Sequence, residues 1–115
     1  MSIDSFKPHP QLADSCNVAY ALQAVGGKWK ISIIWELASQ KPQRLSSLRR
    51  NLVGISEGVL ITQLKNMEQD GLVRRIAYPE LPPHVEYELT NLGQGLIEGI
   101  KELEAWGGAY RHARQ

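Results

Sequence analysis

Residues 44–72 read RLSSLRRNLVGISEGVLITQLKNMEQDGL, and this stretch predicts two helices joined by a tight connection. Leu48 and Leu52 lie four residues apart on a short first helix, and Gly54 then interrupts the chain. Ser56 has the side chain of a helix N-cap and can begin a second helix. A helix-turn-helix arrangement is therefore the starting hypothesis for the fold.

The second helix, residues 56–70, has one apolar side and one polar side. Its apolar residues recur at the i, i+4, i+7 spacing of a buried stripe, and they are Leu60, Leu64 and Met67. At about 100° per residue, the opposite side is small at its N-terminal end and singly charged, and it comprises Gly58, Thr62, Lys65, Asn66 and Gln69. A helix that enters a DNA major groove needs such a side, with a slim leading end and no row of carboxylates. An ordinary amphipathic surface helix has the same pattern, so the rest of the chain must decide.

Length and composition predict one soluble domain. The chain has 115 residues, of which 43% are hydrophobic and 22% are charged, and these values are ordinary for a globular protein. We find no run of about 18 apolar residues and no basic-then-apolar leader. We therefore expect a cytoplasmic protein with no membrane partner. A single cysteine, Cys16, excludes an intrachain disulfide.

Positive charge is concentrated around the proposed reading helix, although the net charge is only +1. Residues 41–75 contain seven basic and three acidic side chains, whereas the rest of the chain contains six basic and nine acidic ones. Phosphate binding requires a local excess of positive charge of this kind. The charge distribution therefore favours DNA as a partner.

The residues before this stretch predict an N-terminal arm followed by two helices. Residues 1–12 contain two prolines and little periodicity, which is typical of a flexible arm. A first helix is expected to begin at Asp14 or Ser15, either of which could cap it, and to end before Gly26. KWKISIIWELAS, residues 28–39, predicts a second and largely buried helix. A buried strand is the alternative, but a span of about a dozen residues favours a helix.

Residues 72–89 change to the alternating pattern of a β-hairpin. In HVEYEL, residues 84–89, one side carries Val85, Tyr87 and Leu89 and is expected to be buried, whereas the glutamates lie on the other side. Between the two runs lies PELPP, which cannot be helical and has few backbone donors. The sequence therefore predicts two strands with a stiff protruding tip.

A final helix is expected to begin after Thr90 and to carry more apolar surface than one small core requires. Its stripe comprises Leu92, Leu96, Ile100 and Leu103, with support from Ile97, Trp106 and Tyr110. We therefore expect a homodimer formed through the terminal helices, with two reading helices about 34–36 Å apart on a palindromic operator. The predicted fold is mainly α with a small β-hairpin (α+β), a winged helix-turn-helix in a single domain spanning residues 13–112.

The candidates for contact with double-stranded DNA come from three elements. In this motif the first helix crosses the phosphate backbone and the second enters the groove. For Arg50 the alternative is a solvated surface charge, and for His84 it is a hydrogen bond within the hairpin. The candidates are Ser46, Ser47, Arg49 and Arg50 around the first helix, Ser56, Gly58, Ile61, Thr62 and Lys65 on the reading helix, and Arg75 and His84 in the wing.

Several strings in this sequence are together specific enough to name a family. They are CNVAYALQAVGGKWKI from Cys16, RLSSLRR from Arg44, GIS from Gly54, LITQLKNMEQDGLV from Leu60, YPELPPHVEYELT from Tyr78 and LG from Leu92. In these the chain resembles the HxlR family of bacterial winged-helix transcription regulators. The resemblance implies a homodimeric DNA-binding repressor or activator, often of a neighbouring gene for detoxification or redox defence. The chain departs from the family at Asn17, where proline is common, and at Leu45, where phenylalanine is usual.

Cys16 carries the most specific regulatory hypothesis. We place it within the first turn of its helix, where free N–H groups and the macrodipole favour a thiolate, although Asp14 opposes this effect. The family resemblance adds that a cysteine at this position senses oxidants or electrophiles in a number of members. Oxidation here could end only in a mixed disulfide, an intersubunit bridge, a sulfenic acid or an alkyl adduct. The alternative is a small buried apolar residue.

Catalysis is not predicted, because G-x-S-x-G, H-E-x-x-H, paired C-x-x-C and phosphate-loop patterns are missing from the sequence. We expect no cofactor and no metal. Two other functions stay open. One is a winged helix kept as a protein-interaction module without DNA binding. The other is a regulator switched by a small molecule between the N-terminal and C-terminal helices, in a pocket that could be lined by Tyr20, Trp29, Trp35 and Trp106, although these aromatic residues also suit a core.

Overall fold

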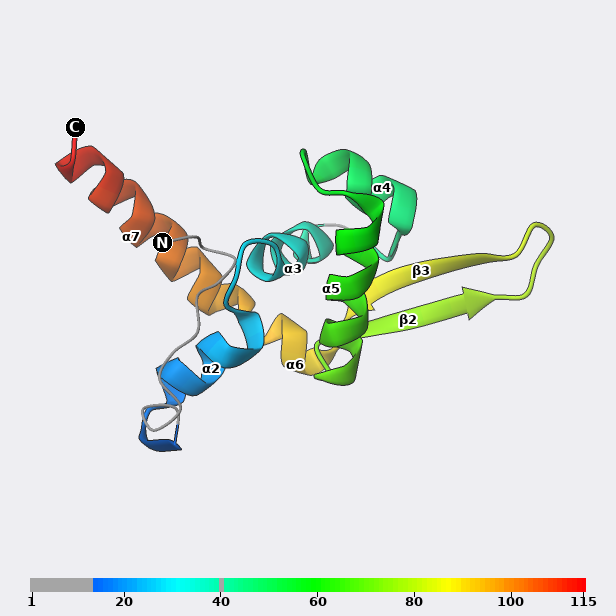
Figure 1. The fold of residues 1–115 in the computed structure, drawn as a ribbon, viewed down its shortest axis with the longest axis horizontal. Helices are drawn as coiled ribbons and strands as arrows, with labels where there is room; N and C mark the ends of the chain where they lie inside the picture. The colour runs from blue at the N-terminus through cyan, green and yellow to red at the C-terminus, as the bar shows by residue number, and fades with distance from the viewer. Residues whose placement is uncertain (1–13, 40) are drawn as a thin grey trace.

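The computed structural model describes residues 14–39 and 41–115. Its elements follow the order of a winged helix-turn-helix (Figure 1), as the sequence predicts. The predicted arm, residues 1–12, lies outside the described residues. The elements are α2 (Asn17–Val25), α3 (Lys30–Ala38), β1 (Gln43–Arg44), α4 (Leu45–Asn51), α5 (Glu57–Gln69), β2 (Val73–Tyr78), β3 (His84–Leu89), α6 (Asn91–Gln94) and α7 (Ile97–Ala113).

The reading helix, α5, forms where its cap and apolar spacing predict it. The Ser56 hydroxyl accepts a hydrogen bond from the Val59 N–H at 3.2 Å, which satisfies one of the free donors of the first turn. The predicted stripe of Leu60, Leu64 and Met67 is buried. Burial of three large side chains fixes which side of α5 faces the core, and it leaves the polar side exposed.

Helix α3 lies at the centre of the core, and the strand alternative for this segment is wrong. Ile33, Ile34 and Leu37 are buried on one side of the helix, in the same core cluster as apolar side chains of the reading helix and the hairpin. In the described part of the chain, no helix has both the length and the apolar character needed to cross a bilayer.

The sheet has a third strand that the sequence did not predict. Strands β2 and β3 pair antiparallel from Val73 opposite Leu89 to the tip, and β1 adds to β3 in the order β1-β3-β2. Gln43 in β1 pairs with Tyr87 and is 5% exposed. Its amide Nε2 donates to the Glu36 carbonyl at 3.0 Å, and its Oε1 accepts from the Ser47 hydroxyl at 3.1 Å.

The predicted burial of alternate residues in β3 is only partly correct. Leu89 is buried, but Val85 and Tyr87 are half-buried and are no better covered than Glu86 and Glu88. The reason is that the wing projects away from the core (Figure 1), so that little packs on its outer part.

The expected single C-terminal helix is two helices. The Thr90 hydroxyl accepts from the Gly93 N–H at 3.2 Å and caps the short helix α6, which ends at Gly95, and α7 follows. The predicted stripe is therefore not continuous. Ile100 is buried, whereas Leu92 is 66% exposed and Leu103 is 56% exposed.

Helix α2 begins later than expected. It starts at Asn17, and its N-cap residue is Cys16, not Asp14 or Ser15, and the Cys16 side chain makes no capping hydrogen bond. Both are instead helical residues that precede the break at Cys16. The predicted position of Cys16 within the first turn is therefore wrong by one residue.

Candidate DNA-binding surface

The reading helix lies between α4 and the wing, and α2 and α7 lie on the other side of the molecule (Figure 1). This arrangement leaves the exposed side of α5 bordered by two elements that carry basic residues. Gly58, Thr62 and Lys65 are exposed on α5, as predicted, and Ile61 is half-buried.

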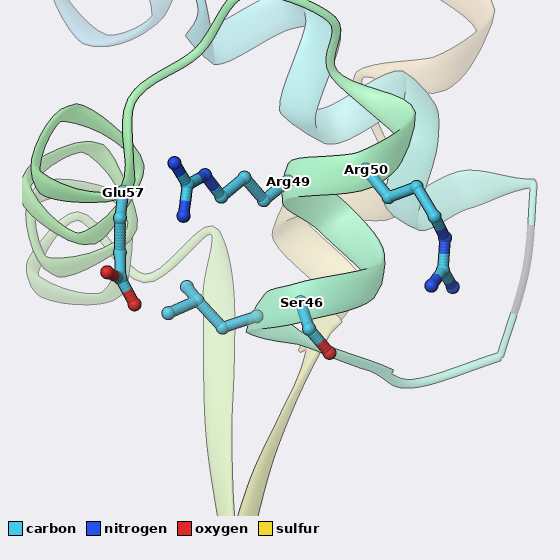
Figure 2. Close-up of a pocket in the computed structure, with 5 residues that line it drawn as sticks. Ser46, Arg49, Arg50 and Glu57 are labelled. Atoms are coloured by element: carbon cyan, nitrogen blue, oxygen red, sulfur yellow. The ribbon is translucent and has the colours of Figure 1, made fainter.

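A groove between α4 and the start of α5, which we call the α4 groove, has a volume of about 580 Å³. Figure 2 shows the Arg49 side chain extending from α4 toward α5, whereas Arg50 points to the opposite side of α4. Glu57, the first residue of α5, faces the same groove. The residues that line it are Leu45, Ser46, Arg49, Arg50 and Glu57.

A second groove, which we call the wing groove, lies between α5 and the hairpin and has a volume of about 470 Å³. It brings Lys65 from the reading helix and Arg75 from β2 together, although ten residues separate them in the sequence. The other residues that line it are Ile61, Glu68, Gln69 and Tyr87. Two cations on neighbouring elements can hold one DNA phosphate strand between them.

The cations around α5 are free to bind an anion. Within residues 14–39 and 41–115, the ion pairs join Arg74 to Glu88 at 3.4 Å, His84 to Glu86 at 3.2 Å and Lys101 to Glu98 at 3.2 Å. None of these pairs includes a basic residue that lines either groove, namely Arg49, Arg50, Lys65 or Arg75. Binding of a phosphate would therefore break no ion pair in this part of the chain.

Two of the predicted serines have partners inside the protein. The Ser47 hydroxyl donates to Gln43, and the Ser56 hydroxyl caps the reading helix. Ser46 is exposed and lines the α4 groove. The three serines, which the sequence grouped as one kind of candidate, therefore differ in how freely their hydroxyls can turn toward DNA.

His84 makes the hydrogen bond within the hairpin that the sequence left as an alternative. Its Nε2 lies 3.2 Å from Glu86 Oε2, and its ring stacks on Tyr78 with 4.6 Å between centroids. Partial burial raises the pKa of the Tyr78 hydroxyl above its ordinary value, and the Glu86 carboxylate adds to this effect. These contacts fix the side chains of Tyr78, His84 and Glu86 next to one another at the start of the wing tip.

Sequence reasoning missed the two carboxylates that border the reading face. Glu57 lines the α4 groove and Glu68 lines the wing groove, one at each end of α5. They are eleven residues apart, which is about three helical turns, so they project from nearly the same side as Ile61. The helical spacing alone could have revealed this alignment. It could not reveal that this side faces α4 and the wing.

Of the four aromatic residues considered for a ligand pocket, Tyr20 and Trp35 border different grooves of the described chain. Tyr20 borders an apolar groove of about 600 Å³ between α2 and α6, together with Leu72 and Leu96. Trp35 borders a separate groove of about 270 Å³ beside Ile100. Trp29 packs against the core, and Trp106 is 62% exposed. Among the described residues, no group of three or more His, Cys, Asp or Glu side chains is placed to hold a metal ion.

The family model described as HxlR-like helix-turn-helix matches residues 24–115 of this chain. The HTH-type transcriptional regulator BH0655 of Halalkalibacterium halodurans is 40% identical over 107 residues, which cover 93% of this chain and 95% of that protein. The structure of YtcD, a regulator from Bacillus subtilis, superposes with a TM-score of 0.78 at 38% identity and covers 83% of this chain and 96% of that one.

The structure of the redox regulator HypR in its reduced form superposes with a TM-score of 0.77 at 34% identity, over 83% of this chain and 93% of that one. The winged helix-turn-helix order and the exposed reading helix agree with these similarities. Similarity in sequence and in fold therefore leads to the same conclusion as the residue patterns. The chain belongs to the HxlR-like helix-turn-helix family, and its relatives BH0655 and YtcD are described as HTH-type transcriptional regulators.

Proposed function

We propose that this regulator acts in the cytoplasm as a homodimer that binds a palindromic DNA operator. In this model α5 enters the major groove with Gly58, Ile61, Thr62 and Lys65 toward the bases, and basic residues beside it bind phosphates. The observation that carries the proposal is that the cations lining the two grooves beside α5 lie in none of the ion pairs of the described chain. Ser46, Ser47 and Ser56 are added as candidates for polar contacts to the backbone, and His84 is added at the wing.

Removal of either cation of the wing groove is expected to lower the affinity for DNA by the same factor whatever the base sequence. Lys65→Ala and Arg75→Ala each delete one phosphate contact, so the slope of log affinity against log salt should fall by about 1. The measurement is a titration of the upstream intergenic DNA at several salt concentrations. Lys101→Ala on α7 is the control, because it also removes one positive charge but lies away from the candidate DNA-binding surface.

An equal change of slope in Lys101→Ala would mean that net charge, and not this surface, governs binding. Absence of selective binding by the unmodified protein at any salt concentration would contradict the operator model. The protein-interaction module would then become the better description of the chain.

The homodimer is supported by an apolar face with no cover in the described chain. Leu103, Trp106 and Tyr110 on α7 are 56%, 62% and 49% exposed, and the rings of Trp106 and Tyr110 stack at 5.0 Å. On α2, Val18 and Tyr20 are 69% and 67% exposed. Apolar side chains grouped in this way on a soluble protein are typical of an interface.

We infer that Cys16 gives the regulator an oxidant response. Its thiol is free and half-buried at the start of α2, the helix that also carries the exposed Val18 and Tyr20. HypR, which is similar in fold, is described as a redox regulator, and its structure is known in a reduced and an oxidised form. Oxidation of Cys16 would therefore act on the surface that is proposed to join the subunits.

Diamide treatment is expected to lower the DNA affinity of the unmodified protein by about ten-fold, within the usual range of allosteric coupling. A reducing agent should restore binding. Cys16→Ser should bind DNA equally well and ignore diamide, because no other cysteine is present. The measurement is an operator titration before and after each treatment. Loss of affinity in oxidised Cys16→Ser would contradict the thiol mechanism, and regulation through a ligand in the apolar groove between α2 and α6 would then be favoured.

A further inference from the structure

The first turn of the reading helix carries an exposed carboxylate that the proposed DNA contacts do not use. Glu57 lines the α4 groove, and Figure 2 shows it on α5, across from the residues of α4. In the described chain Glu57 takes part in no ion pair, since the three pairs lie elsewhere. A carboxylate in this position opposes phosphate binding, so it lowers affinity for DNA in general.

The residue after Glu57 indicates that this turn approaches another molecule closely. Gly58 is exposed, and a Cβ atom added to it would meet nothing within 4 Å. The fold therefore does not need glycine at this position, although glycine is a poorer helix former than alanine. A side without a Cβ lets the backbone of α5 lie close to base edges, and helix-turn-helix proteins contact bases mainly with the first residues of this helix.

A carboxylate among base edges can only accept hydrogen bonds. In the major groove, the cytosine N4 amino group is the donor that glutamate pairs with, whereas guanine N7 and O6 are acceptors and would repel it. Arg49, which lines the same groove, can bind the neighbouring phosphate and offset the negative charge of the carboxylate.

We propose that Glu57 is a specificity-determining residue that selects cytosine at one position in each operator half-site. This assignment rests on the proposed DNA-binding function. Glu57 accepts a hydrogen bond from the cytosine amino group, and it excludes a guanine at that position by repulsion. It therefore lowers the affinity for unrelated DNA and strengthens discrimination between sequences.

The test is selection of bound sequences from a pool of randomised duplexes, with the unmodified protein, Glu57→Gln and Glu98→Gln. Glu98 is the matched control, because it is likewise an exposed glutamate in the first turn of a helix, α7, away from the reading surface. The unmodified protein should select cytosine at one position in each half-site. In Glu57→Gln the preference for cytosine over other bases should fall about ten-fold at that position only. This variant should also bind unrelated DNA more tightly. Glu98→Gln should keep the original preference.

Two outcomes would overturn the role of Glu57. One is an unchanged preference in Glu57→Gln, and the other is an equal change in Glu98→Gln, which would assign both residues to helix-terminal stabilisation alone. Thermal unfolding of both variants shows that each is folded. Failure of the proposed function itself would look different, because the unmodified protein would then select no common sequence.

Discussion

Leu103→Asp is expected to convert the protein from a dimer to a monomer and to lower its affinity for an operator with two half-sites by about 100-fold. Leu103 is 56% exposed beside Trp106 on the apolar side of α7. In the proposed dimer an aspartate there would be buried without a partner, which is unfavourable. A monomer can use only one reading helix, so it loses the gain from binding both half-sites at once.

Sedimentation at micromolar concentration and an operator titration measure the two effects. Gly108→Asp is the control, because residue 108 lies about 140° around the helix from residue 103, and a Cβ at Gly108 meets nothing within 4 Å. It should leave both the dimer and the affinity in place. A monomeric unmodified protein, or a Leu103→Asp protein that remains dimeric, would contradict the α7 interface.

Gly93→Ala is expected to lower the free energy of unfolding by about 3 kcal/mol. Gly93 is buried in the first turn of α6, and a Cβ atom on it would overlap the carbonyl oxygen of Leu72. That oxygen also accepts a hydrogen bond from the Thr90 N–H at 3.0 Å. The Cβ position is fixed by the backbone and the Leu72 oxygen is itself a backbone atom, so neither can turn away, and the connection between the reading helix and the C-terminal helices must distort.

Chemical denaturation of Gly93→Ala and of Gly108→Ala measures this effect. The second variant is the matched control, because it makes the same change in an open helical position and should stabilise the protein by up to about 1 kcal/mol. A Gly93→Ala protein as stable as the unmodified one would show that this backbone contact can relax.

The reading helix and the hairpin could be predicted from the sequence because their determinants are local. Ser56 and the stripe of Leu60, Leu64 and Met67 lie within one helix, and each acts on residues three or four positions away. The two strands of the wing are adjacent in the chain, and the proline-rich tip between them excludes other structures.

The elements that prediction missed depend on distant parts of the chain. Strand β1 has only two residues, and it is a strand because β3 pairs with it some forty residues later. The C-terminal helix divides at Gly95 although its apolar spacing runs on, because α6 packs against β3 whereas α7 packs against α3. Helical spacing does not report such a change of direction.

The candidate site was predictable by residue type but not by arrangement. Positive charge around the reading helix is visible in the sequence, and so is the exposed polar side of α5. The meeting of Lys65 and Arg75 in one groove, and of Glu57 with Arg49 in another, requires the packing angles of α4 and the wing against α5. These angles are set by side chains in the core and not by the residues of the surface itself.

The buried side chain of Gln43 fixes the spacing between α4 and the wing on the candidate DNA-binding surface. It joins the end of α3, through the Glu36 carbonyl, to α4, through Ser47, while its backbone is paired with β3 of the wing. In the proposed complex, α4 crosses one phosphate strand and the wing reaches the next, and both elements are tied to Gln43. They cannot adjust independently to a duplex of unsuitable shape. If the proposed function holds, we expect operators whose groove width already matches this spacing to need the least deformation, and DNA stiffness at base pairs that the protein never touches to contribute to recognition.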